Sequence, residues 1–325
     1  MPSSPRFPRI SGAGPALWLL LVLEAAVFSR TGTNFAGREN AFEVLKFSVE
    51  IGLLAAVMTP VILTGGIDLS VGSLLGLCAV CFGQLWRDAR LAWEVAAVLT
   101  LAIGGLAGGL NALLVTRLRI PPLMATLGTF SLFRGAAEAL TRGVDNFTGF
   151  PASFLAHGQG YYAGILPAQV PVFLAVAAFL WVLAHQTTLG RSWRAIGFSP
   201  EGARHAGLPV ERQVALAYLL SGVVAALAAL LYVARVGQAK ADAGTGYELL
   251  AITAVVLGGT SIFGGRGSVP GTLLGVVVLA VLKNGLQLSD QPAELAGILT
   301  GVLLILALTA EAAGRWGRRR RATPA

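Results

Sequence analysis

The sequence predicts an all-α polytopic membrane protein with about ten transmembrane helices. Of its 325 residues, 55% are hydrophobic and only 12% are charged, and the mean hydropathy is +0.73. Soluble domains carry about 25% charged residues. The apolar residues also gather in runs of roughly 17–25 residues, which is long enough for a helix to cross a hydrocarbon core about 30 Å thick.

The apolar runs can be placed along the chain directly. Helices fit them better than barrel strands, because alternation with period two is absent and only these two structures satisfy backbone polar groups in lipid. Glycine or proline shortens three of the runs (47–64, 69–85 and 269–284), so some helices should be short or broken. The ten runs are 15–29, 47–64, 69–85, 91–116, 122–141, 168–186, 213–234, 246–262, 269–284 and 293–312.

Ten spans would place both chain termini on one side of the membrane. If that side is the cytoplasm, the inner loops carry more Lys and Arg than the outer ones, as the positive-inside rule requires. We therefore expect a single membrane domain over 1–325, with an embedded body at 15–312 and a basic cytoplasmic tail at 313–325. The net charge of +8 is explained by these flanking arginines, so we expect contact with lipid and none with nucleic acid.

The sequence carries no recognisable catalytic, nucleotide-binding or metal-binding set. Its lysines, Lys46, Lys240 and Lys283, stand outside any G-x-x-x-x-G-K-[ST] pattern. Cys78 and Cys81 lie inside an apolar run without further ligands nearby, and the histidines are scattered. We therefore expect that this chain is not an enzyme and holds no cofactor.

A short internal repeat links the two halves of the chain. The stretch SVGSLLG (70–76) recurs as SVPGTLLG (268–275), and each copy follows a glycine pair, Gly65–Gly66 or Gly264–Gly265. Paired glycine-interrupted segments in two halves indicate the central site of a transporter.

An aspartate, Asp68, lies between the first glycine pair and the first copy of the repeat. A charge at the centre of a spanning helix costs about 2.5–3.5 kcal/mol on insertion scales. That cost falls if Asp68 caps a helix that starts at Leu69 near the cytoplasmic face, accepting from the N–H group of Ser70 or Val71. Direct contact with a solute or a gate is the alternative, and the two roles are compatible.

Other polar residues inside the apolar runs are candidates for the same pathway. Asn111 lies in a glycine-rich span whose pairs Gly104/Gly108 and Gly105/Gly109 suit close helix packing. It could bond across helices or line a pathway. The run 122–141 also offers hydrogen-bonding and aromatic groups together, in Thr126, Thr129, Phe130 and Ser131. The predicted pathway or gate residues are Asp68, Ser70, Asn111, Thr126, Phe130 and, as a weaker candidate, Asn284.

The polar segment 187–212 is different in kind, because it spells out a short helix. Ser199 suits the N-cap, Pro200 the first helical position, and Glu201 the positive end of the helix dipole. Gly207 supplies the stop, and a proline follows it. A helix of about two turns is marginal in water, so a partner or packing must hold it. An ordinary connector is the alternative.

This segment resembles the cytoplasmic coupling segment of the membrane subunits of ABC importers, most closely those of the ribose-type monosaccharide permease family. The branched-chain amino acid permeases are a related group. Three other stretches resemble the same family, in the same order, and with the loop they cover roughly residues 47–290. They are TGGIDLSVGSLLGL (64–77), GLNALLVTRLRIPPLMATLGT (109–129) and GYELLAITAVVLGGTSIFGGRGSVPGTLLGV (246–276).

The resemblance implies an ABC importer transmembrane domain in the bacterial inner membrane. A second permease subunit, identical or homologous, would complete the pathway, and a periplasmic binding protein would deliver a monosaccharide or similar small polar solute. Two cytoplasmic ATPase subunits, which bind ATP and Mg²⁺, would dock on the coupling segments. The residues expected to serve that coupling are Arg191, Arg194, Ser199, Glu201, Arg204 and Gly207.

Other readings remain open from the sequence. An importer of this kind could carry a branched-chain amino acid, a nucleoside or a signalling sugar. An ion-coupled secondary transporter would show similar repeats and broken helices. The segment 187–212 and the shortage of charges in the spans argue against that reading.

Overall fold

The computed structural model describes residues 14–322, and these form a helical body as expected. Each of the ten predicted apolar runs coincides with a helix. Between them the structure adds short helices and two-residue strands. The helices are α1 (Gly14–Thr31), α2 (Arg38–Phe47), α3 (Val49–Leu63), α4 (Val71–Arg87), α5 (Trp93–Thr116), α6 (Pro122–Leu140), α7 (Ala152–Gln159), α8 (Gln169–Gln186), α9 (Thr188–Phe198), α10 (Pro200–His205), α11 (Val210–Val236), α12 (Tyr247–Leu257), α13 (Val269–Leu288) and α14 (Ala293–Ala322).

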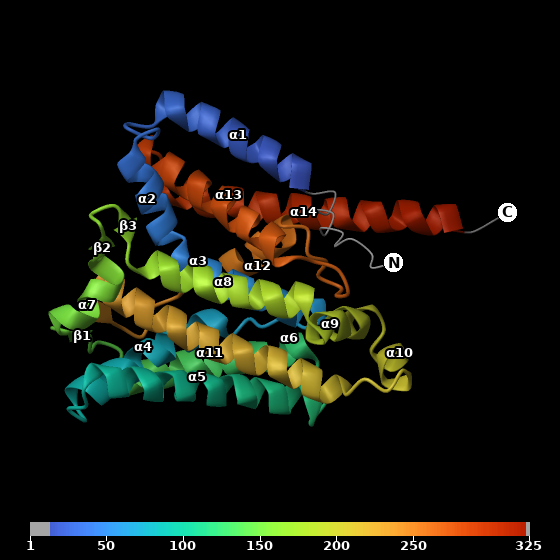
Figure 1. Ribbon diagram of the computed structural model, residues 1–325, viewed down its shortest axis with the longest axis horizontal. Coiled ribbons are helices and arrows are strands. Elements are labelled where there is room, and N and C mark those ends of the chain that lie inside the picture. The colour runs from blue at the N-terminus through green and yellow to red at the C-terminus, as the bar shows by residue number, and fades with distance from the viewer. Residues whose placement is uncertain (1–13, 323–325) are drawn as a thin grey trace, which may run out of the picture.

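The long helices run side by side, and the two ends of the bundle differ (Figure 1). One end, which we call the α7 end, carries α7 and the strands. The other, which we call the α10 end, carries α9 and α10. The first residues of α1 and the last of α14 lie toward the α10 end (Figure 1). The strands are β1 (Phe147–Thr148), β2 (Tyr161–Tyr162), β3 (Leu166–Pro167) and β4 (Gln238–Ala239), paired antiparallel as β1–β4 and β2–β3.

The helices are apolar and long enough to make this a multi-pass membrane protein. Within the described residues, 6 helices could cross a bilayer by length and composition, or up to 7 if α2 and α3, bent by 49°, count as one span. The six are α1, α5, α8, α11, α13 and most of α14. Two apolar helices are shorter, α4 with 17 residues and α12 with 11. The expected total of about ten spans stays a prediction.

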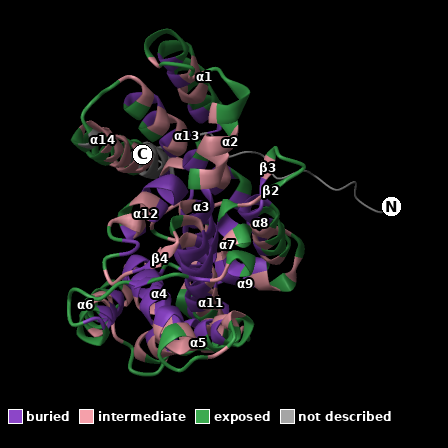
Figure 2. Ribbon diagram, turned by 90° about the vertical axis from the view of Figure 1, so that its left-hand side faces the viewer, coloured by how far each residue is buried: buried purple, intermediate pink, exposed green. Residues whose placement is uncertain are grey.

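The core of the bundle is built on α3 and α11. Every residue of α3 except Ile51 is buried, and α3 is apolar on all sides, as suits a helix surrounded by others. α11 packs along α5, α3 and α4. Figure 2 shows α3, α4 and α11 as mostly buried, whereas α5 lies at the edge of the bundle with exposed residues. By contrast, α14 packs mainly against α12 and α13 and leaves large apolar side chains such as Ile305 and Leu306 exposed.

Glycines set the contact between α5 and α11, as the sequence predicts for one of its two pairs. A Cβ atom added to Gly222 of α11 would lie 2.1 Å from the carbonyl oxygen of Gly104 and 2.7 Å from the nitrogen of Gly108. In the other pair, a Cβ atom on Gly105 would lie 3.3 Å from the Val223 side chain of α11, whereas one on Gly109 would meet nothing within 4 Å. The two helix backbones therefore touch along a single stripe.

The short apolar helices α4 and α12 both follow irregular backbone, and each copy of the internal repeat begins a helix. Residues 64–70 precede α4, and residues 240–246 precede α12. The repeat places Ser70 and Ser268 at the N-caps of α4 and α13, and Gly65 and Gly264 each have a φ of +85°, which favours glycine. Irregular backbone at membrane depth is tolerated only where protein buries it or a water-filled cavity meets it.

The glycine stripe yields a paired stability test. Gly222→Ala should lower the apparent melting temperature in detergent by several degrees, because its methyl group overlaps the Gly104 carbonyl and overpacking costs about 1–3 kcal/mol. Gly109→Ala should leave that temperature unchanged or slightly raised, because alanine is the better helix former and the space is open. Equal melting temperatures for the two variants would contradict the packing described.

Candidate functional site

A buried polar network surrounds Asp68, in the segment that joins α3 to α4. Asp68 is only 1% exposed. Its Oδ1 accepts from the backbone N–H of Ser70 at 3.0 Å and from the Ser70 hydroxyl at 2.6 Å. Its Oδ2 accepts from the hydroxyl of Ser221, on α11, at 2.8 Å. Segment 64–70 and α11 therefore meet at one carboxylate.

The network continues from Ser70 into α5 and α6. The Asn111 amide of α5 donates to the Ser70 hydroxyl oxygen at 2.8 Å and lies 3.5 Å from Asp68 Oδ1. The Thr129 hydroxyl of α6 donates to Asn111 Oδ1 at 2.7 Å. Four parts of the fold are thus joined through neutral donors and one acid.

No cation of the described residues lies within 4.0 Å of the Asp68 carboxylate, so its charge is held by hydrogen bonds and by the adjacent N-terminus of α4. The predicted cap is right in one respect, since the Ser70 N–H does donate to it. It is wrong about the helix start: α4 begins at Val71 with Ser70 as N-cap, two residues later than expected. Leu69 and Ser70 form a tight turn after Asp68 instead of the first turn of the helix.

The backbone before Asp68 is held by two further side chains. Thr126 of α6 donates to the Ile67 carbonyl at 3.1 Å, and the Tyr218 hydroxyl of α11 lies 3.5 Å from the same oxygen. A Cβ atom on Gly66 would lie 2.5 Å from that tyrosine hydroxyl. Glycine at this position therefore lets Tyr218 reach the turn.

The protrusion at the α10 end contains two helices where the sequence predicts one. The predicted helix is α10: the Ser199 hydroxyl accepts from the Gly202 N–H at 3.0 Å, and Gly207 ends the turn with a φ of +81°. The helix α9 precedes it and was not predicted. Buried side chains of Ile196, Ala203 and Val210 pack together and hold α10 against α9 and α11.

Arg194 faces inward from α9. Its guanidinium donates to the Ala184 carbonyl at 2.6 Å and lies 3.4 Å from the Gly267 carbonyl, so it ties α9 to α8 and to the segment before α13. Burial lowers the pKa of Arg194 below its ordinary value, but an arginine remains charged in proteins. Arg191, Glu201 and Arg204 are exposed instead.

A contact between glycine backbones joins the protrusion to both repeat segments. We call it the glycine junction, and it consists of Gly65, Gly197, Gly264 and Gly265. A Cβ atom on Gly197 of α9 would lie 2.0 Å from the Leu63 carbonyl oxygen and 2.4 Å from the Gly265 nitrogen. One on Gly264 would lie 2.9 Å from the Cα atoms of both Gly65 and Gly197. The Gly265 N–H donates to the Leu63 carbonyl at 3.0 Å.

Comparison with known proteins identifies the family. The profile described as "Branched-chain amino acid transport system / permease component" matches residues 40–308. The chain belongs to this permease family. The permease is 37% identical over 324 residues to an "Autoinducer 2 import system permease protein LsrD" of Yersinia enterocolitica, covering 95% of this chain and 96% of that one. It is 38% identical over 322 residues to the protein of that name from Yersinia pseudotuberculosis, covering 94% and 95%. No solved structure matches it.

The permease is therefore a membrane-spanning subunit of an ABC importer, located as a multi-pass protein in the inner membrane. It is a transporter subunit and not an enzyme by itself. Importers of this family work with an ATPase and a substrate-binding partner. The network around Asp68 and the protrusion at the α10 end are the two parts of the permease that this assignment has to explain.

The structure gathers most of the predicted pathway residues and sets two apart. Asp68, Ser70, Asn111 and Thr126 all belong to the network. Phe130 is half-buried beside it on α6 and adds no hydrogen bond. Asn284 lies elsewhere: its amide pairs reciprocally with Asn40 of α2, at 2.9 Å in each direction, and so joins α13 to α2.

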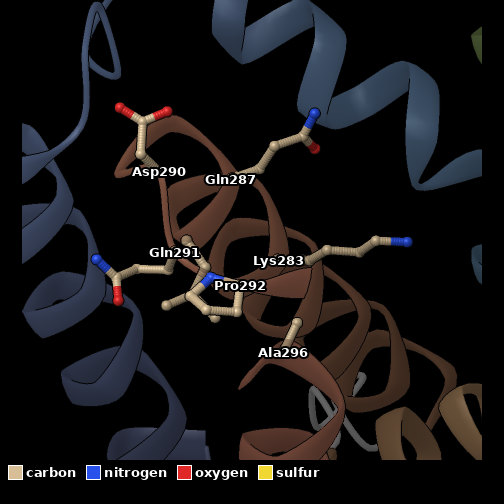
Figure 3. A pocket seen from close by; sticks show the side chains of 7 residues that line it. Lys283, Gln287, Asp290, Gln291, Pro292 and Ala296 are labelled. Carbon is tan, nitrogen blue, oxygen red and sulfur yellow. The ribbon is translucent and has the colours of Figure 1, made fainter. Parts of the chain in front are cut away.

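Two members of the network were missed from the sequence. Tyr218 and Ser221 stand three residues apart in the run 213–234, which places them on one face of α11. Polar side chains at that spacing inside an apolar run were the available signal. A further space, of about 360 Å³, lies at the turn between α13 and α14 and is lined by Lys283, Leu286, Gln287, Asp290, Gln291, Pro292 and Ala296 (Figure 3). It is separate from the network.

The network yields a test of whether Asp68 is needed as an acceptor. Asp68→Asn keeps an oxygen for Ser70 and an amide that can donate to Ser221, so the melting temperature in detergent should stay close to that of the unaltered permease. Asp68→Ala leaves three buried donor groups unpaired, at about 1–3 kcal/mol each, and should lower it markedly. If alanine proves as stable as asparagine, the network does not depend on this acceptor.

Proposed function

We propose that the permease forms, with a second permease subunit, the pathway by which autoinducer 2 or a closely similar small, uncharged, sugar-like solute enters the cell. The observation that supports this solute most directly is the match to autoinducer 2 permeases over 95% of the chain. The polar network fits it, because hydroxyl and amide groups suit a solute rich in hydroxyl groups. The second subunit would be a copy of this chain or a homologue.

We propose ten membrane crossings, made by α1, α2–α3, α4, α5, α6, α8, α11, α12, α13 and α14. The bundle supports this count, since these segments alternate in direction and bring both ends of the chain to the α10 end (Figure 1). The α10 end would be cytoplasmic and the α7 end periplasmic. In this arrangement 15–312 forms the embedded body, and 313–325 the basic tail. The side chains of that tail lie outside the described residues.

The protrusion would serve as the docking point for two cytoplasmic ATPase subunits, one on each permease subunit. It presents an exposed face that includes Phe198, 81% exposed, with Glu201 and Arg204 on the next turn. An exposed aromatic flanked by charges suits a protein partner better than lipid. Ser199 and Gly207 would act by shaping α10, Arg194 by fixing α9, and Arg191 by direct contact.

The glycine junction gives the protrusion a route to the pathway. A displacement of α9 acts on Leu63 and Gly265 directly, because no side chain separates these backbones. Five residues after Leu63 lies Asp68, whose bonds reach α5 and α11. In this proposal ATP and Mg²⁺ are bound by the ATPase, and the permease contributes only the moving parts. A periplasmic binding protein would deliver the solute at the α7 end.

The solute is tested by uptake into proteoliposomes that hold the complete importer. The ATPase faces the vesicle lumen, and the binding protein is added to the outer solution. Autoinducer 2 uptake should require ATP, the ATPase and the binding protein together, and ribose should compete weakly or not at all. Leucine is the informative comparison, because the family description names branched-chain amino acids. Leucine uptake without autoinducer 2 uptake would contradict the proposed solute, and uptake driven by an ion gradient alone would contradict the ATP-driven class.

The docking face is tested by the double variant Glu201→Ala/Arg204→Ala. Membrane insertion should be unaffected, whereas uptake should fall at least tenfold while the ATPase still hydrolyses ATP at its basal rate. Arg204 also pairs with Glu211 at 2.7 Å, but both side chains are about half exposed, so losing this pair should cost little stability.

Glu211→Gln is the matched control for that variant, since it removes the same ion pair and leaves α10 intact. Its uptake should stay within about twofold of the unaltered permease. Normal uptake in the double variant would remove this face from the coupling mechanism.

A further inference from the structure

The segment 240–246 reaches back into the bundle from the α7 end. It follows β4, whose partner β1 lies at that end, and it leads into the short helix α12 (Figure 1). Its backbone packs against α4, where two glycines admit it. A Cβ atom on Gly76 would lie 2.8 Å from the carbonyl oxygens of both Ala241 and Ala243, and one on Gly72 would lie 2.6 Å from that of Gly244.

Arg134 of α6 holds this segment and keeps one nitrogen unused. Its Nη1 donates to the carbonyls of Ala241 and Ala243. Its Nη2 is buried and has no hydrogen-bond partner. An arginine inside an apolar run is costly and marks a functional site by default. Two carbonyl bonds explain why the side chain lies here, but they leave the free nitrogen unexplained.

Glu248, in the first turn of α12, presents the opposite case. Its side chain is only 8% exposed, and its Oε2 is buried without a partner. That oxygen lies against α4, 2.0 Å from where a Cβ atom of Gly72 would be. Arg134 and Glu248 make no ion pair within 4.0 Å of each other. A free donor and a free acceptor therefore face the same stretch of α4.

The two free atoms lie close to the network around Asp68. Arg134 contacts α4 at Gly76 and Glu248 contacts it at Gly72, four residues or about 6 Å apart along the helix. Gly72 comes two residues after Ser70, which bonds Asp68. Arg134 and Glu248 therefore lie next to that network, on the side nearer the α7 end. Figure 2 shows α4 beside both α6 and α12.

We propose that Arg134 and Glu248 form a solute-binding site in the pathway, which takes one hydroxyl group of a neutral, polyhydroxylated solute. The hydroxyl hydrogen is donated to Glu248 Oε2, and the hydroxyl oxygen accepts from Arg134 Nη2. Buried polar atoms are nearly always paired in proteins, and a solute hydroxyl supplies both missing partners at once. The inference rests on the proposed function, since it assumes a sugar-like solute.

The charges around the site favour a neutral solute over an amino acid. Three acids act electrostatically on Arg134, namely Glu248, Glu138 and Asp242. A carboxylate entering the site would therefore approach one cation surrounded by acids, which is unfavourable. A hydroxyl group needs no net charge. Both Arg134 Nη2 and Glu248 Oε2 are buried in this structure. The solute therefore gains access when segment 240–246 moves away from α4.

The site is tested in the complete importer with autoinducer 2 as the probe, by measuring uptake and ATP hydrolysis together. Glu248→Gln and Arg134→Lys should each reduce the solute imported per ATP at least tenfold, while ATP hydrolysis stimulated by the loaded binding protein is retained. Glu94→Gln, an exposed glutamate of α5, is the matched control and should stay within twofold. Uptake within twofold of normal in both site variants would overturn the proposal.

A second measurement covers the case in which the site variants fail to assemble. Thr245 is exposed beside the site, so Thr245→Cys can be introduced in a chain whose Cys78 and Cys81 are replaced by alanine. Autoinducer 2 should slow labelling of the new thiol by a charged maleimide at least threefold, and an unchanged labelling rate would overturn the proposal. If the unaltered importer carries no autoinducer 2, the proposed function fails instead. If it carries leucine and depends on Glu248, the site exists but the neutral-solute proposal is wrong.

Discussion

The structure depends on the direct contact between the backbone of Gly197 and the two segments that carry the internal repeat. Leu63 ends α3 and leads to Asp68, and Gly265 leads to the start of α13. With only hydrogen atoms between them, α9 cannot move without displacing both. An added methyl group would have to lie about 2 Å from a carbonyl oxygen, so the contact exists only because this position is glycine.

The network around Asp68 joins one carboxylate to neutral donors, and no cation of the described residues lies within 4.0 Å of it. The carboxylate is shared among segment 64–70, α5 and α11, and the nearby pair of Arg134 and Glu248 is shared among α4, α6 and α12. Both sites lie where irregular backbone enters the bundle. A network of neutral donors can exchange partners at modest cost, which suits a gate that opens and closes around a solute rich in hydroxyl groups. In the proposed mechanism, the ATPase supplies the energy and the protrusion transmits it to the network.

The sequence predicted the features that depend on neighbouring residues. The apolar runs marked every long helix, the pattern from Ser199 to Gly207 marked α10, and the glycine pairs marked the breaks before α4 and α13. It missed α9, whose short amphipathic pattern is hidden in a polar segment. It also missed the partners that only folding brings together. Ser221 bonds Asp68 and Tyr218 contacts the Ile67 carbonyl, each from about 150 residues away, and the contact of Gly197 with Leu63 leaves no mark on either stretch. Asn284 looked like a pathway residue because its partner, Asn40, lies 244 residues away in the sequence.

The most direct test of this account is Gly197→Ala in the complete importer, with uptake and ATP hydrolysis measured on the same proteoliposomes and Gly109→Ala as the control in open space. The account predicts that Gly197→Ala still assembles with the ATPase and hydrolyses ATP, but imports at least tenfold less solute per ATP than the control. Normal import per ATP in Gly197→Ala would show that force does not pass through this contact, and would contradict the central claim.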